Sequence, residues 1–132
     1  MSELYELPPE DVEYLQARFS SKWRKVSEGP GKHGLIIEDF NLPHGYTKPE
    51  SNLMILVPVG YPGSALDMFY FSPHLKKSDG TGISALADES HFGQTWQRWS
   101  RHYKDSAWQP GVDTLITHIE FIQNETLKEV PK

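Results

Sequence analysis

The chain has no cysteine among its 132 residues. It can therefore form no disulfide, offer no thiolate to a metal ion, and carry no acyl group as a thioester. Long apolar runs are missing as well, since none approaches the roughly 20 residues that a membrane-spanning helix needs. The first six residues are acidic and lack the apolar core of a signal peptide, so we expect a cytoplasmic protein with no membrane partner.

Positively charged residues are fewer than negatively charged ones. The chain has 13 lysines and arginines against 18 acidic residues, which gives a formal net charge of −5. A general nucleic-acid-binding surface is basic, so this balance argues against nucleic acid as a partner. The length suits one domain spanning residues 1–132, with enough chain to bury a substantial core.

The first half of the sequence predicts one helix followed by strands. Proline and acidic residues at positions 8–11 are typical of a helix start, so we expect a helix over residues 9–18. Short apolar segments separated by turn residues then predict an antiparallel meander of four strands. These strands are expected at residues 23–28, 34–40, 52–59 and 68–71.

The second half predicts two more helices. In residues 93–104, Trp96, Trp99 and Tyr103 have the spacing of one helical face. Residues 112–127 carry a broader apolar stripe, which is the clearest helical pattern in the chain. We expect this last helix to pack on the sheet, with Leu115, Ile119 and Ile122 against Ile36, Met54, Leu56 and Phe69.

Several short motifs follow one another in a characteristic order. They are a Tyr-Pro turn, a strand ending in a proline turn, a Gly-Thr pair, and a Trp-x-Pro before an amphipathic helix, and here they read Tyr61-Pro62, Ser72-Pro73-His74, Gly80-Thr81 and Trp108-Gln109-Pro110. In this order and spacing the motifs resemble the ubiquitin-conjugating enzymes. The segment from Thr95 to His102 is similar to the prokaryotic family E branch of that fold.

The resemblance implies an α+β, ubiquitin-conjugating-enzyme-like fold. Its expected parts are an N-terminal helix, a four-stranded antiparallel meander, a central amphipathic helix and truncated C-terminal helices. It also implies three protein partners: a ubiquitin-like protein, an activating enzyme and a target protein lysine. In the family a cysteine follows the Gly-Thr pair, whereas here Ile83 stands at that position, between Gly82 and Ser84. The family's asparagine after the turn proline is replaced by His74.

A serine ester is the nearest substitute for the missing thioester. A serine hydroxyl needs a base, usually histidine, within hydrogen-bond reach. We take Ser100 as the first candidate nucleophile, with His102 as its base, and Ser84 as the second. His91 and His74 are the further catalytic candidates.

Two arginines and a tryptophan accompany these residues. Arg98, Arg101 and Trp99 are predicted to bind the partner, and the arginines could instead stabilise an oxyanion. The three histidines near the site match no common zinc spacing, and we predict neither a metal nor a cofactor.

Two functions remain open. The first is a transferase that accepts a ubiquitin-like protein and passes it to a lysine. The second is a non-catalytic adaptor that binds a ubiquitin-like protein or a partner enzyme. RNA binding through the Arg- and Trp-containing segment is a weaker third alternative, because the net charge is acidic.

Overall fold

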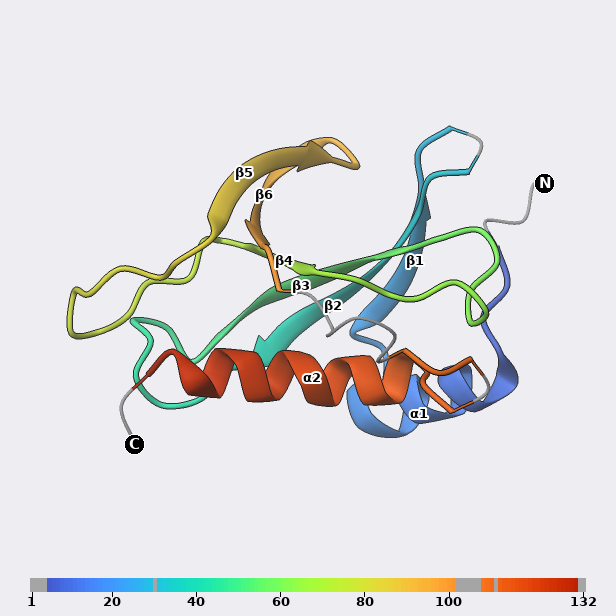
Figure 1. The fold of residues 1–132 in the computed structure, drawn as a ribbon, viewed down its shortest axis with the longest axis horizontal. Helices are drawn as coiled ribbons and strands as arrows, with labels where there is room; N and C mark the ends of the chain where they lie inside the picture. Colours follow the sequence, from blue (N-terminus) through green and yellow to red (C-terminus); the bar gives the residue numbers. More distant parts are fainter. Residues whose placement is uncertain (1–4, 30, 102–107, 111, 131–132) are drawn as a thin grey trace.

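In the part of the chain that the structure describes, a six-stranded antiparallel sheet carries two helices on one of its faces (Figure 1). The computed structural model describes residues 5–29, 31–101, 108–110 and 112–130. The elements are, in chain order, α1 (Pro9–Phe19), β1 (Trp23–Ser27), β2 (His33–Asn41), β3 (Glu50–Val57), β4 (Phe69–Ser72), β5 (Leu86–His91), β6 (Gln94–Trp99) and α2 (Leu115–Lys128). The strand order is β1-β2-β3-β4-β6-β5.

The predicted α+β class and the meander of β1 to β4 are confirmed, but the prediction of only four strands is wrong. The last two strands form a hairpin that joins the sheet through β6, which pairs with β4 at Phe69↔Trp99 and Phe71↔Gln97. In Figure 1 this hairpin curls away from the side of the sheet that carries the helices. Neither helix in the described ranges is long and apolar enough to cross a membrane.

The hairpin also corrects the helix predicted over residues 93–104, because residues 94–99 form β6; Tyr103 lies outside the described residues. The Phe92-Gly93 turn has positive φ at both positions, 53° and 82°, and this geometry joins two antiparallel strands directly. Side chains alternate along a strand, so Trp96 and Trp99, three positions apart, lie on opposite faces of the sheet. Each side chain packs into a different cluster of buried residues. The spacing of three that suggested one helical face therefore comes from two tryptophans on opposite faces of a strand.

The main core lies between the sheet and the two helices. The predicted burial of Leu115, Ile119 and Ile122 is confirmed, with at most 1% of each residue exposed. The prediction of which sheet residues contact them is wrong in part. The strand residues that share their cluster include Leu35, Ile37, Leu53, Ile55, Phe69 and Phe71.

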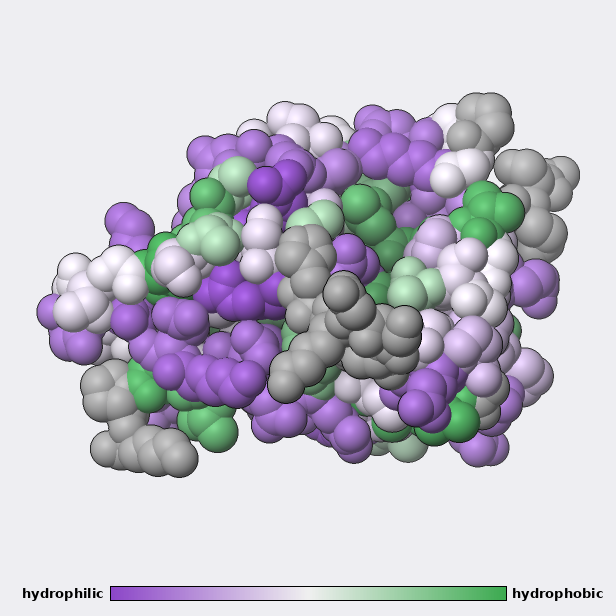
Figure 2. Space-filling model, in the orientation of Figure 1, coloured by the Kyte–Doolittle hydropathy of each residue, from purple (hydrophilic) through white to green (hydrophobic). Residues whose placement is uncertain are grey.

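Ile36 and Met54 belong instead to a second cluster with Tyr70 and Trp96, on the other face, and Leu56 packs against it. β2 and β3 are buried on both faces, so the apolar pattern alone could not show which residues meet the helices. Figure 2 shows hydrophilic residues over much of the face in view, with smaller hydrophobic areas between them.

Helix α2 begins three residues later than predicted, for a local reason. The Thr114 side chain accepts a hydrogen bond from the Ile116 amide, while the Thr117 hydroxyl accepts one from the Thr114 amide. This reciprocal cap satisfies amides that the first turn of a helix leaves unpaired. Val112 therefore lies outside the helix, where it is 66% exposed.

Candidate functional site

The position where the resemblance expects a cysteine lies in the connection between β4 and β5. We call residues 79–85 the slot loop. Within it, Ile83 is half-buried and packs against the main core, while Ser84 is exposed. Beside the loop is a surface hollow of about 320 Å³, lined among others by Leu75, Lys76, Gly82 and Ile83.

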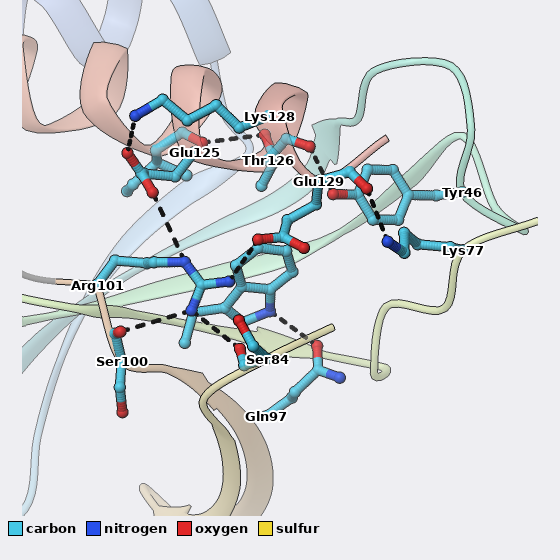
Figure 3. A network of polar contacts seen from close by, with 12 residues as sticks. Tyr46, Lys77, Ser84, Gln97, Ser100, Arg101, Glu125, Thr126, Lys128 and Glu129 are labelled. Atoms are coloured by element: carbon cyan, nitrogen blue, oxygen red, sulfur yellow. Dashed lines mark hydrogen bonds and ion pairs between the residues drawn. The ribbon is translucent and has the colours of Figure 1, made fainter. Parts of the chain in front are cut away.

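Arg101 connects the slot loop to the C-terminal half of α2 (Figure 3). Its Nη1 donates a hydrogen bond to the Ser84 carbonyl oxygen at 3.1 Å, although the two residues are 17 positions apart. Its Nη2 lies 3.0 Å from a carboxylate oxygen of Glu129, and its Nε lies 3.6 Å from one of Glu125. The guanidinium carbon stands 4.9 Å from the centre of the Trp99 ring. Only 10% of the Arg101 side chain is exposed.

Two more contacts anchor the same end of α2. The Tyr46 hydroxyl donates to the Thr126 carbonyl at 2.6 Å, and Lys77 Nζ donates to the Glu129 carbonyl at 2.8 Å. Burial raises the pKa of the Tyr46 hydroxyl, so this group stays protonated and remains a donor. The loop before β3 and the loop after β4 are thus both attached to the helix.

The structure brings Ser100 next to the slot loop. The Ser100 amide donates to the Ala85 carbonyl at 3.0 Å, and its hydroxyl oxygen accepts from Arg98 Nε at 3.1 Å. Arg98 in turn pairs through Nη1 with Glu89. Ser84, Ser100, Arg98 and Arg101 therefore gather where β6 ends beside the slot loop.

The histidines near the site contact acids. His74 Nε2 lies 2.7 Å from Asp88 Oδ1, and His91 Nε2 lies 2.9 Å from Glu89 Oε1. The contact with His91, together with Arg98, holds the pKa of Glu89 below its usual value. In the part of the chain that the structure describes, neither His74 nor His91 is hydrogen-bonded to a candidate serine. His102 lies outside the described residues.

Trp99 is fully buried. Its ring stacks on Phe69 with centroids 5.5 Å apart, and its Nε1 donates to Gln97 Oε1 at 2.9 Å. Gln97 is itself held by both backbone groups of Leu75. Trp99 thus joins the core to the connection that leads into the slot loop, and the roles predicted for it and for the other site residues remain predictions.

One comparison with known proteins decides the family. The model of the family described as Prokaryotic E2 family E matches residues 7–129. The chain belongs to this family. Comparisons with curated proteins and with solved structures gave no match.

Membership in family E implies a role related to ubiquitin-like conjugation. In general terms it also implies interaction with a ubiquitin-like protein and an activating enzyme. Because its sequence contains no cysteine, this chain cannot carry a ubiquitin-like protein as a thioester. Among the described residues no group of three histidine or acidic side chains is placed to hold a metal ion.

Sequence analysis missed a buried polar contact that joins both helices to the Tyr-Pro turn. The Tyr61 hydroxyl donates to Asp11 Oδ2 at 2.5 Å and accepts from the Leu115 amide at 2.5 Å. Asp11 is fully buried, and burial raises the pKa of its carboxyl group. The sequence offered no signal for this contact, because an acid in the first turn of a helix is usually solvated.

A buried histidine, His118, links α2 to the sheet. It is fully buried on α2 and its Nε2 lies 3.0 Å from the carbonyl oxygen of Met68, the residue immediately before β4. Burial lowers its pKa to about 4, so the neutral ring donates to this carbonyl at neutral pH. Its place among apolar residues of an amphipathic helix was the available signal.

Proposed function

We propose that this family E protein accepts a ubiquitin-like protein from an activating enzyme and transfers it to a target lysine through a serine ester. The observation that carries the proposal is the hydrogen bond from the Ser100 amide to the Ala85 carbonyl. This bond favours Ser100 as the nucleophile, because it holds the residue beside the slot loop, where the family has its cysteine. The hydrogen bond from Arg98 to the Ser100 hydroxyl supports the same choice, because a cationic donor stabilises negative charge developing on that oxygen.

The proposed reaction has two steps. First, the serine oxygen attacks the activated C-terminal carbonyl of the ubiquitin-like protein; the bond to the activating enzyme breaks, and the serine proton leaves with that enzyme's group. Second, the neutral lysine amine attacks the ester carbonyl and forms an amide, the carbon–oxygen bond to serine breaks, and the proton that the amine loses balances the one that the serine oxygen gains. Esters react with amines more slowly than thioesters, so orientation of the lysine and stabilisation of the tetrahedral intermediate must supply several kcal/mol.

A specific observation favours the adaptor as a second candidate. The two described histidines of the site are paired with Asp88 and Glu89, whereas a serine nucleophile needs a base. An adaptor would bind a ubiquitin-like protein or a partner enzyme on the same surface without forming a covalent bond.

The two candidates differ in whether an adduct forms. The protein is incubated with its activating enzyme, the ubiquitin-like protein and ATP, and products are separated with and without thiol reductant. A serine ester resists mild reductant and is cleaved by hydroxylamine. Ser100→Ala should abolish this adduct, or Ser84→Ala if the second candidate serine is used, whereas Ser90→Ala on the exposed surface of β5 is the matched control.

Ile83→Cys gives an independent test of the position. The chain has no other cysteine, so an adduct that requires ATP and that thiol reductant removes from this variant is a thioester at residue 83, whereas a disulfide would form without ATP. We expect such a thioester, because the proposal has the donor carbonyl presented at the slot loop. An absent ester in the wild type together with an absent thioester in Ile83→Cys would refute the transferase and leave the adaptor.

A further inference from the structure

We infer that Arg101 is a positioning residue that holds the slot loop in place from inside the protein, and that it does not bind the partner. The kinetic part of this inference rests on the proposed function, because it concerns the position of the candidate serines. The structural part, which concerns the loop itself, does not.

All three nitrogens of the Arg101 guanidinium are engaged within the chain. Nη1 reaches the Ser84 carbonyl, Nη2 reaches Glu129 at 3.0 Å, and Nε faces Glu125 at 3.6 Å. One face of the group also covers the Trp99 ring. Little of the guanidinium is left for a partner's carboxylate, because every nitrogen already has a contact within the chain and the side chain is only 10% exposed.

The two acids are matched to this position. Glu125 lies in the last turn of α2, and Glu129, four positions later, is the C-cap residue with helical φ and ψ, so both point to the same side of the helix end. Their side chains are 16% and 23% exposed, which limits solvent screening of the pair with Arg101. The planar guanidinium can bridge these acids and a backbone carbonyl at once, a geometry that the single ammonium of lysine cannot provide.

The loop needs such a restraint. Ala85, next to Ser84, has a φ of 57°, in the left-handed region that is unfavourable for residues other than glycine. Its carbonyl accepts from the Ser100 amide, while Arg101 holds the preceding carbonyl. The two hydrogen bonds fix consecutive peptide groups of the loop against the end of β6, and so fix where Ser84 and Ser100 lie relative to each other.

The backbone of Arg101 adds a second link. Its carbonyl accepts from the Met68 amide at 3.2 Å, and the Met68 carbonyl is in contact with His118 of α2. Both the backbone and the side chain of Arg101 thus connect the sheet to α2. Loss of the side chain leaves the backbone link, so we expect the slot loop to be released while the sheet and helices stay assembled.

The first measurement is amide hydrogen exchange in full-length Arg101→Gln, Arg101→Lys and Arg24→Gln. Arg24 also pairs with a glutamate, Glu38, but at an exposed site on β1, so it is the matched control. The Ser100 amide should exchange about tenfold faster in both Arg101 variants, and its exchange rate should be unchanged in the control. The Leu53 amide in the core strand β3 reports on global unfolding and should change less than about twofold.

The second measurement is the rate of ester formation as the concentration of the activating enzyme carrying the ubiquitin-like protein is raised. A positioning role predicts a lower maximal rate at an unchanged half-saturating concentration. A partner-binding role predicts a higher half-saturating concentration at an unchanged maximal rate, and this result would overturn the inference. So would unchanged Ser100 exchange in Arg101→Gln, or full restoration of that exchange in Arg101→Lys.

If the Leu53 amide also exchanges faster in Arg101→Gln, that variant is globally destabilised. Exchange of the Ser100 amide in Arg101→Lys then tests the inference, because lysine keeps the buried positive charge. If the wild type forms no ester, the proposed function fails, while the exchange measurement still decides the role of Arg101.

Discussion

Acidification should destabilise this protein through His118. The ring is fully buried on α2, with Phe121 stacked beside it and the Met68 carbonyl 3.0 Å from its Nε2. Burial lowers the pKa of His118 to about 4, against an ordinary value of 6.5 in the unfolded chain. Between these values the unfolded state binds a proton that the folded state does not, so stability falls as pH falls.

The magnitude follows from the two pKa values. The contribution of His118 is fully present above pH 6.5, decreases through the window from 6.5 to 4, and is mostly lost near pH 4. A difference of this size corresponds to about 3 kcal/mol. That is a large share of the roughly 5–15 kcal/mol by which domains are usually stable.

The assay is urea unfolding at pH 7, 6, 5 and 4, comparing the wild type with His118→Gln. Glutamine does not titrate, and its amide can still donate to the Met68 carbonyl. The variant is expected to lose stability at neutral pH, because its shape differs from that of the ring, but to show a shallower decline on acidification. The unfolding free energy of the wild type minus that of the variant should fall by about 3 kcal/mol from pH 7 to pH 4. Parallel pH profiles would refute the assignment of this acid sensitivity to His118.

Three further predictions concern stability. Ile119→Ala should lower the unfolding free energy by about 2–5 kcal/mol in urea, because the residue is fully buried; a loss below about 1 kcal/mol would contradict its place in the core. Burial raises the pKa of Asp11, so folding favours its protonated form and stability falls as pH rises from the unfolded value through the folded one. Asp11→Asn keeps an acceptor for Tyr61, and its stability relative to the wild type should rise across that window and then level off; a constant difference would argue against the shift. Ala85→Gly should stabilise by up to about 1 kcal/mol because φ is positive there, whereas Ala17→Gly on the exposed face of α1 should cost about 1 kcal/mol; equal losses in thermal unfolding would refute this reasoning.

Local sequence determined most of the elements. Proline and acids start α1, turn residues separate the first four strands, and the apolar stripe of α2 was recognisable because its other face is polar. The absence of cysteine excludes a thioester by itself, whatever the fold, because no other side chain supplies a thiol. The order of short motifs also indicated the family to which the chain belongs, because motifs at turns depend on residues that are neighbours in the chain.

Only the tertiary structure decided which strand faces meet the helices and what the site contains. The faces of β2 were ambiguous because both are buried, and the turn that joins β5 to β6 has Phe92 at a positive φ, where glycine or asparagine would have been the usual signal. Ser100 lies beside the slot loop, and Arg101 lies between that loop and α2. These contacts join residues far apart in the sequence, and their geometry arises only when the sheet curls and α2 packs against it, so local pattern carried no information about them.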